Sequence, residues 1–154
     1  IRRQRQMCIR DSNLNVSEGR DTVLASIIGK VLENWWQGEV ANNGTDRYQR
    51  ATRLYTVLSA LGHGVPAKLW LPLYEVPVGD PQQVHTALLI VLELAAAAGR
   101  RGEVVLLSLL LLGDRGPGRS DTITLGRIVL ALRQVGLKRD AAAVAFEGLL
   151  AVGF

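Results

Sequence analysis

The sequence predicts an all-α fold of stacked helix hairpins, an α-solenoid of tetratricopeptide-like type with a repeat of about 37 residues. Hydrophobic residues make up 48% of the chain but aromatic residues only 5%, and the abundance of Leu, Ala and Val favours helices. Apolar residues recur three or four positions apart, which is the spacing of one helix face. Three glycines, Gly62, Gly99 and Gly136, end such segments at equal intervals. A plain helical bundle is the alternative.

Three helices are expected in the first half of the chain. The segment DTVLASIIGKVLENWW, residues 21–36, pairs its apolar residues at steps of four and begins with an Asp that can cap a helix. The sequence NNGTD then interrupts the pattern, and Asp46 can cap a second helix that runs to Leu61. Pro66 suits the first turn of a short third helix, which is expected to reach Tyr74.

Four more helices are expected in the second half. The sequence Asp-Pro-Gln-Gln resembles a capping box and opens the fourth helix, and a Gly/Pro-rich loop separates the fifth helix from the sixth. Glycines end the fourth and the sixth helix. The expected ranges are about 80–98, 101–112, 120–136 and 138–152.

The three glycines also align the apolar positions around them. Seven residues before each glycine stand Tyr55, Leu92 and Val129, and apolar residues match again eleven before and eight after. Each unit therefore has the form helix, glycine, helix. Such a hairpin cannot bury its apolar face alone, whereas stacked neighbours can. Residues 13–154 are accordingly expected to form a single all-helical repeat domain.

Residues 1–12, IRRQRQMCIRDS, lack an apolar period and resemble the translation of a sequencing-library adapter. We expect this segment to be non-native and to take no part in the fold. It holds four of the 18 basic and one of the 14 acidic residues, so the net charge of +4 falls to +1 for the rest. The electrostatic case for nucleic-acid binding is thereby removed. The only Cys and the only Met also lie here, so we expect the rest to be the C-terminal fragment of a longer protein.

The second half of the chain resembles a known group of proteins. Residues 81–153 contain AAAAGRRGEVVLLSLLLLGDRGPG and RIVLALRQVGLKRDAAAVAFEGLLA. These segments look like the C-terminal region of large, Ala/Leu-rich, uncharacterised proteobacterial proteins. The resemblance implies a bacterial source, a helical repeat tail with a natural C-terminus, and no catalytic chemistry. It indicates no compartment.

One segment has the spacing of a phosphate-binding loop. Residues 113–120, GDRGPGRS, follow an apolar run and match G-x-x-x-x-G-x-S. However, Arg119 stands where that loop has lysine, Pro117 removes an N–H group, and Asp121 places negative charge where phosphate would lie. The segment is therefore expected to be a Gly/Pro connection between hairpins, and no cofactor is expected.

No catalytic, metal-binding or membrane-spanning pattern is recognised. His63 and His85 lie in different units, without a Cys or a second His at the spacing of metal ligands. The apolar run at 104–112 is much shorter than the ~20 residues that span a bilayer. We therefore expect no enzyme active site, no metal and no membrane span in this chain.

The aromatic residues are unevenly distributed, because every Trp and Tyr lies between residues 35 and 74. Clustered aromatic side chains commonly anchor interaction surfaces. We therefore expect the surface that meets a partner to include Trp35, Trp36, Trp70 and Tyr74. The alternative is that these rings fill gaps against missing upstream repeats.

The sequence as a whole predicts a non-catalytic helical-repeat scaffold that binds a protein or peptide, or its own missing upstream repeats. Self-association of the fragment is a further expectation, because a truncated stack exposes apolar surface. The alternative is the helical accessory tail of an enzyme whose catalytic domain lies upstream.

Overall fold

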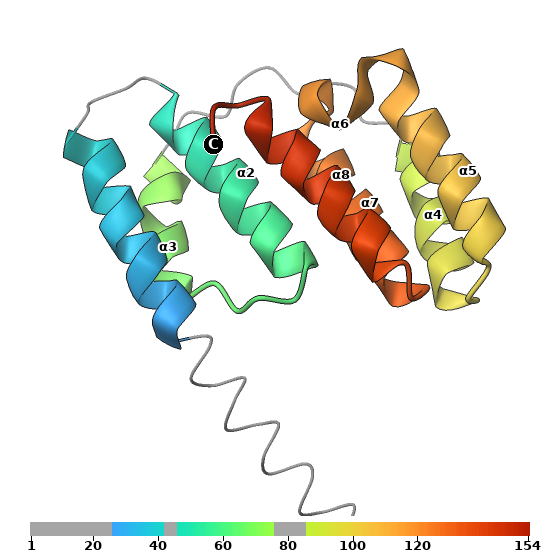
Figure 1. The fold of residues 1–154 in the computed structure, drawn as a ribbon, viewed down its shortest axis with the longest axis horizontal. Coiled ribbons are helices and arrows are strands. Elements are labelled where there is room, and N and C mark those ends of the chain that lie inside the picture. The colour runs from blue at the N-terminus through green and yellow to red at the C-terminus, as the bar shows by residue number, and fades with distance from the viewer. Residues whose placement is uncertain (1–25, 42–45, 76–85) are drawn as a thin grey trace, which may run out of the picture.

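The computed structural model describes residues 26–41, 46–75 and 86–154, and all regular structure in these residues is helical (Figure 1). The all-α class predicted from the sequence is therefore confirmed. Residues 1–12, together with Asp21, Asp80 and His85, lie outside the described residues. A helix through residues 26–41 comes first, and the other elements in chain order are α2 (Arg47–Ala60), α3 (Ala67–Trp70), the 3₁₀ helix η1 (Leu71–Glu75), α4 (Thr86–Ala97), α5 (Arg101–Leu112), the 3₁₀ helix η2 (Gly113–Arg115), α6 (Gly116–Arg119), α7 (Thr122–Gln134) and α8 (Lys138–Leu150).

The three equally spaced glycines all follow the end of a helix, as predicted. Their φ angles are positive, at 88° for Gly62, 69° for Gly99 and 86° for Gly136, a region that glycine enters without steric cost. In each turn the residue after the glycine donates its N–H to the carbonyl five residues earlier, at 2.9 Å: His63 to Leu58, Arg100 to Ala95 and Leu137 to Leu132. These bonds define three Schellman caps, so the predicted turns are confirmed.

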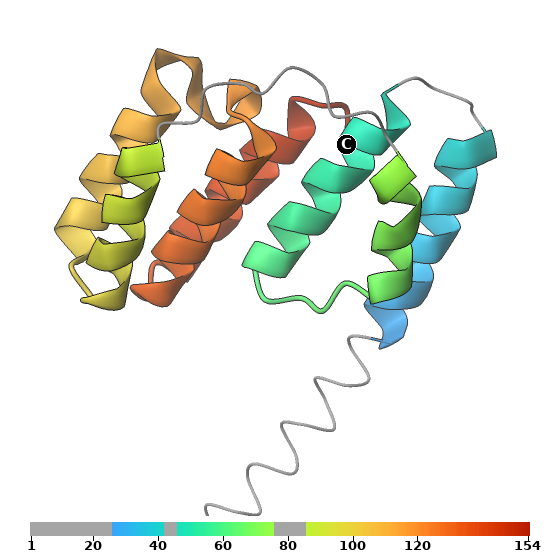
Figure 2. The same cartoon turned by 180° about the vertical axis from the view of Figure 1, so that it is seen from behind.

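The helices run alternately up and down, and α4 with α5 and α7 with α8 form antiparallel hairpins (Figures 1 and 2). In a linear solenoid each hairpin packs against the next one in the sequence. Here the α7–α8 hairpin lies between α2 and the α4–α5 hairpin, so the third predicted unit separates the first from the second. The stacking in chain order that the repeat implied is not confirmed.

Helix α7 takes this central place because its sequence is apolar or small on more than one face. It contacts α2, α4, α5 and α8. Its buried residues include the three consecutive positions Thr124, Leu125 and Gly126, which no single helix face could hold. Gly126 brings α2 close, since a Cβ atom there would lie 2.6 Å from Cγ2 of Thr56.

Two apolar cores result, and α2 belongs to both. The larger core lies among α4, α5, α7 and α8 and includes Val57 and Ala60 of α2. The smaller core includes Ala51 and Tyr55 of α2 with Leu32 of the first helix and Leu69 of α3. The α4–α5 hairpin therefore forms one end of the molecule, and the helix at 26–41 with α3 forms the other (Figure 2).

Candidate functional site

The segment with phosphate-loop spacing forms a compact turn around a side chain of α2. Arg53 is 7% exposed, and its guanidinium donates to carbonyl oxygens on three sides. Nε bonds Gly148 at 2.9 Å, Nη1 bonds Ser120 at 2.8 Å, and Nη2 bonds Pro117 at 2.7 Å and Gly118 at 3.3 Å. This turn therefore joins α2, α6 and α8 through one cation.

The polarity of this turn is opposite to that of a phosphate-binding loop. A phosphate loop directs N–H groups at an anion, whereas this turn directs carbonyl oxygens at a cation. Burial lowers the pKa of Arg53 from its ordinary value, and the Asp121 carboxylate acts in the opposite direction. Asp121 also caps α7, because its Oδ1 accepts the N–H of Thr124 at 2.8 Å. That nucleotides do not bind here stays a prediction, and the orientation of the carbonyls supports it.

The aromatic residues expected to form an interaction surface are mostly packed on one another. Trp35 and Trp70 both lie edge-on to the buried ring of Tyr55, with centroids 6.3 Å and 5.5 Å away. Trp36 contacts Tyr48, with centroids 5.8 Å apart. Only Tyr74 of the four predicted residues is largely free, at 75% exposure. Their role in binding a partner stays a prediction, and the packing gives three of them a structural role within the chain.

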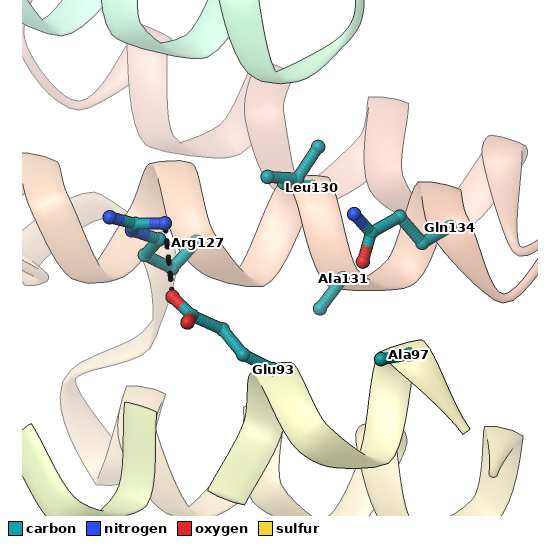
Figure 3. A pocket seen from close by; sticks show the side chains of 6 residues that line it. All are labelled: Glu93, Ala97, Arg127, Leu130, Ala131 and Gln134. Carbon is teal, nitrogen blue, oxygen red and sulfur yellow. Dashed lines mark ion pairs between the residues drawn. The ribbon is translucent and has the colours of Figure 1, made fainter. Parts of the chain in front are cut away.

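A pocket of about 200 Å³ lies between α4 and α7 (Figure 3). Glu93 and Arg127 form an ion pair of 3.0 Å at its mouth, and both side chains are half exposed. Ala97, Leu130, Ala131 and Gln134 complete the lining. Ligand pockets for small molecules usually measure about 300–1,000 Å³, and an exposed ion pair contributes about 0–1 kcal/mol. The pocket offers little to hold a ligand.

Acidic residues and histidines do not gather elsewhere in the described part of the chain. No group of three metal-ligating side chains occurs within residues 26–41, 46–75 and 86–154. His63 is exposed in the turn after α2.

The most distinctive surface is apolar and lies on the outward side of the α4–α5 hairpin. We call it the outer face. Its members are large aliphatic residues that are 38% to 66% exposed: Ile90, Val91 and Leu94 of α4, and Val105, Leu106, Leu109 and Leu110 of α5. Figures 1 and 2 show that α5 lies at the edge of the molecule, so no other described helix covers this side.

The outer face follows from the composition of the two helices. The inward positions of α4 and α5 hold buried residues such as Leu92 and Val104, both fully buried. The outward positions are equally apolar, because TALLIVLELAAA and RGEVVLLSLLLL have no polar face. A helix that is apolar all round is normally buried all round, yet the structure covers only one side of each.

The charged residues of the hairpin lie at its margins, and Glu93, Arg100 and Glu103 form ion pairs. Glu93 binds Arg127 of α7, and Arg100 binds Glu103 at 2.6 Å across the turn that starts α5. The guanidinium of Arg101 lies beside Gly136, 3.2 Å from where a Cβ of that glycine would stand. The centre of the outer face thus carries no charge.

The outer face was not predicted from the sequence. The composition of α4 and α5 predicted hairpin helices that neighbouring units bury. The signal that was available is the lack of a polar face on either helix, but which of two apolar sides is covered depends on the packing order of the hairpins.

No family model, curated protein or solved structure matches the chain. The resemblance to proteobacterial C-terminal regions therefore stays a prediction. Within the part of the chain that the structure describes, each helix is too short or too polar to cross a bilayer.

Proposed function

We propose that this chain is a non-catalytic helical module that binds protein, and that the outer face of α4 and α5 is its binding surface. The single observation that carries the proposal is the group of seven large aliphatic side chains exposed together on one hairpin. Isolated exposed aliphatic residues are ordinary, whereas a contiguous group of this size marks an interface.

The energy available from covering the outer face is large. Five members, Ile90, Leu94, Leu106, Leu109 and Leu110, are more than half exposed. Full burial of one such side chain contributes about 1.5–3 kcal/mol. The exposed fractions of these five together equal about three fully exposed side chains, so covering them contributes roughly 5–9 kcal/mol. The largest exposed ring of the aromatic group, Tyr74, could add only part of this amount. The outer face is therefore the stronger of the two candidate surfaces.

The polar groups described in the structure support a binding role over a catalytic one. The buried cation, Arg53, is fully used by the turn that surrounds it. Glu93 and Arg127 form an exposed pair at a small pocket, and Asp121 caps a helix. Each of these groups thus has a structural task.

Hydrophobic dye fluorescence tests which surface is available. We expect the purified chain, diluted to nanomolar concentration so that self-association does not cover the face, to bind the dye, and Leu106→Glu with Leu110→Glu to reduce the signal several-fold. Phe146→Glu on α8 is the matched control, because Phe146 is 63% exposed but lies away from the outer face. Tyr74→Ala tests the aromatic surface. The proposal would be contradicted if Tyr74→Ala abolished the dye signal while the variant with Leu106→Glu and Leu110→Glu kept the wild-type signal.

A further inference from the structure

We propose that the occupant of the outer face is a second copy of this chain. Two α4–α5 hairpins would pack face to face about a twofold axis and form a four-helix bundle at the centre of a dimer. The inference rests on the proposed function, since it names the partner of the same face. Three features of the described residues lead to it: the area of the face, its lack of charge and its shape.

The area is close to what a stable dimer needs. The exposed fractions of the seven aliphatic residues together equal nearly four fully exposed side chains, which is on the order of 600 Å² and at the upper end of patches on monomers. Exposed Ala87 of α4 and exposed Ala98, directly after that helix, extend the same side. The total approaches the ~800 Å² that each partner buries in an interface of standard size.

The lack of charge favours a copy of the same surface. Interfaces between different proteins carry polar and charged groups that select the partner, whereas homodimer interfaces are more apolar. The charges nearest the outer face are already paired within the chain, as Glu93 with Arg127 and Arg100 with Glu103. Two identical faces can therefore meet without bringing like charges together.

The shape also suits twofold symmetry. Helices α4 and α5 each have 12 residues and run antiparallel, so two hairpins related by a twofold axis overlap along their whole length. Antiparallel helix pairs of this kind pack as four-helix bundles. Gly102 lies on the exposed side of α5, and a Cβ atom there would meet nothing within 4 Å in its own chain. A helix of a second copy can therefore approach α5 closely at this position.

A membrane surface is the competing occupant, and the charges argue against it. Helices that lie on membranes carry many Lys and Arg residues along the margin of the apolar side. The α4–α5 hairpin has two acidic residues, Glu93 and Glu103, and its basic residues, Arg100 and Arg101, stand only at the end near Gly99. An uncharged protein surface therefore fits the outer face better than a membrane does.

The test is a charge-exchange experiment followed by sedimentation equilibrium. One variant carries Leu106→Glu and Leu110→Glu, and the other carries Leu106→Lys and Leu110→Lys. Both positions are about two-thirds exposed, so the monomer can fold with either charge, and circular dichroism checks that it does. Phe146→Glu is again the control.

We expect the wild-type chain to form a dimer in the micromolar range, and each charged variant to dimerise about 100-fold more weakly. An equimolar mixture of the two variants should regain the dimer, because only an interface between like faces brings Glu opposite Lys. Phe146→Glu should dimerise like the wild type.

The following results would overturn the proposal. A wild-type dimer that is unaffected by Leu106→Glu with Leu110→Glu would place the contact elsewhere. A wild-type monomer that still binds dye through the outer face would exclude the second copy as the occupant but leave the proposed function standing. A wild-type monomer that binds no dye would exclude both proposals. A wild-type monomer that floats with phosphatidylcholine vesicles, and no longer does so in the Glu variant, would assign the face to a membrane.

Discussion

Replacement of Arg53 by Met removes the cation that joins three segments of the fold. The Met side chain fills much of the volume of the arginine stem but donates no hydrogen bond. The carbonyls of Gly148 and Pro117 then lose a buried partner, and those of Ser120 and Gly118 lose a partly buried one. The change therefore tests whether the turn at residues 113–120 depends on the guanidinium.

The magnitude follows from the burial of these groups. A buried acceptor left without a donor costs about 1–3 kcal/mol. This cost applies to the carbonyl of Gly148, whereas the carbonyl of Pro117 keeps the hydroxyl of Ser120 as a donor at 2.8 Å. The partly buried carbonyls of Ser120 and Gly118 add a smaller cost. Removal of a buried charge recovers part of this cost, because the guanidinium no longer has to be desolvated. We therefore expect the free energy of unfolding to fall by about 2 kcal/mol, a substantial part of the 5–15 kcal/mol typical of a domain.

Urea denaturation followed by circular dichroism measures the change. Arg119→Met is the matched control, because Arg119 lies in the same turn but is exposed, and it should change stability by less than about 0.5 kcal/mol. Arg53→Lys should give an intermediate loss, since an ammonium cannot reach carbonyls on three sides as a planar guanidinium does. If Arg53→Met unfolds at the wild-type urea concentration with an unchanged slope, the carbonyls do not depend on Arg53 and the reasoning fails.

Two further predictions concern packing and ionisation. Gly126→Ala should destabilise the fold by about 1–3 kcal/mol in thermal or urea unfolding, because its Cβ would stand 2.6 Å from Thr56. Gly38→Ala is the control, because a Cβ at this position of the helix at 26–41 meets nothing within 4 Å, and it should be neutral or stabilise by up to about 1 kcal/mol. If the two variants lost equal free energy of unfolding, the result would contradict the packing of α7 on α2. Burial raises the pKa of Tyr55 from 10.0 to about 12. Because the folded state holds this proton more tightly than the unfolded state, its contribution, up to about 3 kcal/mol, is complete below pH 10 and is lost as the pH rises towards 12. Tyr55→Phe should remove that part of the pH dependence, and a pH profile unchanged by this substitution would refute the assignment.

Local features of the fold could be predicted from the sequence. The ends of α2, α4 and α7 at Gly62, Gly99 and Gly136 depend on residues within one turn, because only glycine enters the left-handed region without cost. The range of α5 also agrees with the prediction. These signals are short-range and are fully contained in the amino-acid order.

The order of packing could not be predicted in the same way. Tyr55, Leu92 and Val129 are equivalent in the glycine alignment and are all fully buried. Yet this equivalence does not say which hairpins are neighbours. The place of α7 depends on Gly126 meeting Thr56 and on Arg53 reaching Pro117, contacts between residues far apart in the sequence.

The candidate site was missed for the same reason. Trp35, Trp36 and Trp70 stood out in the sequence because aromatic residues are rare, but their rings pack on Tyr55 and Tyr48. Leu106 and Leu110 resemble the many other leucines of the chain. Their exposure arises only because α7 occupies the place between α2 and α4.

The central place of α7 also determines when the chain can fold as it leaves the ribosome. Arg53 finds its carbonyl partners 64 to 95 residues later in the chain, and α2 packs on a helix that is synthesised after α4 and α5. The residues of the smaller core all precede residue 76, but Val57 and Ala60 of α2 cannot be buried in the larger core until α7 has been synthesised. These contacts between distant parts of the chain leave the apolar surface of nascent α2, α4 and α5 open to chaperones until the last two helices emerge.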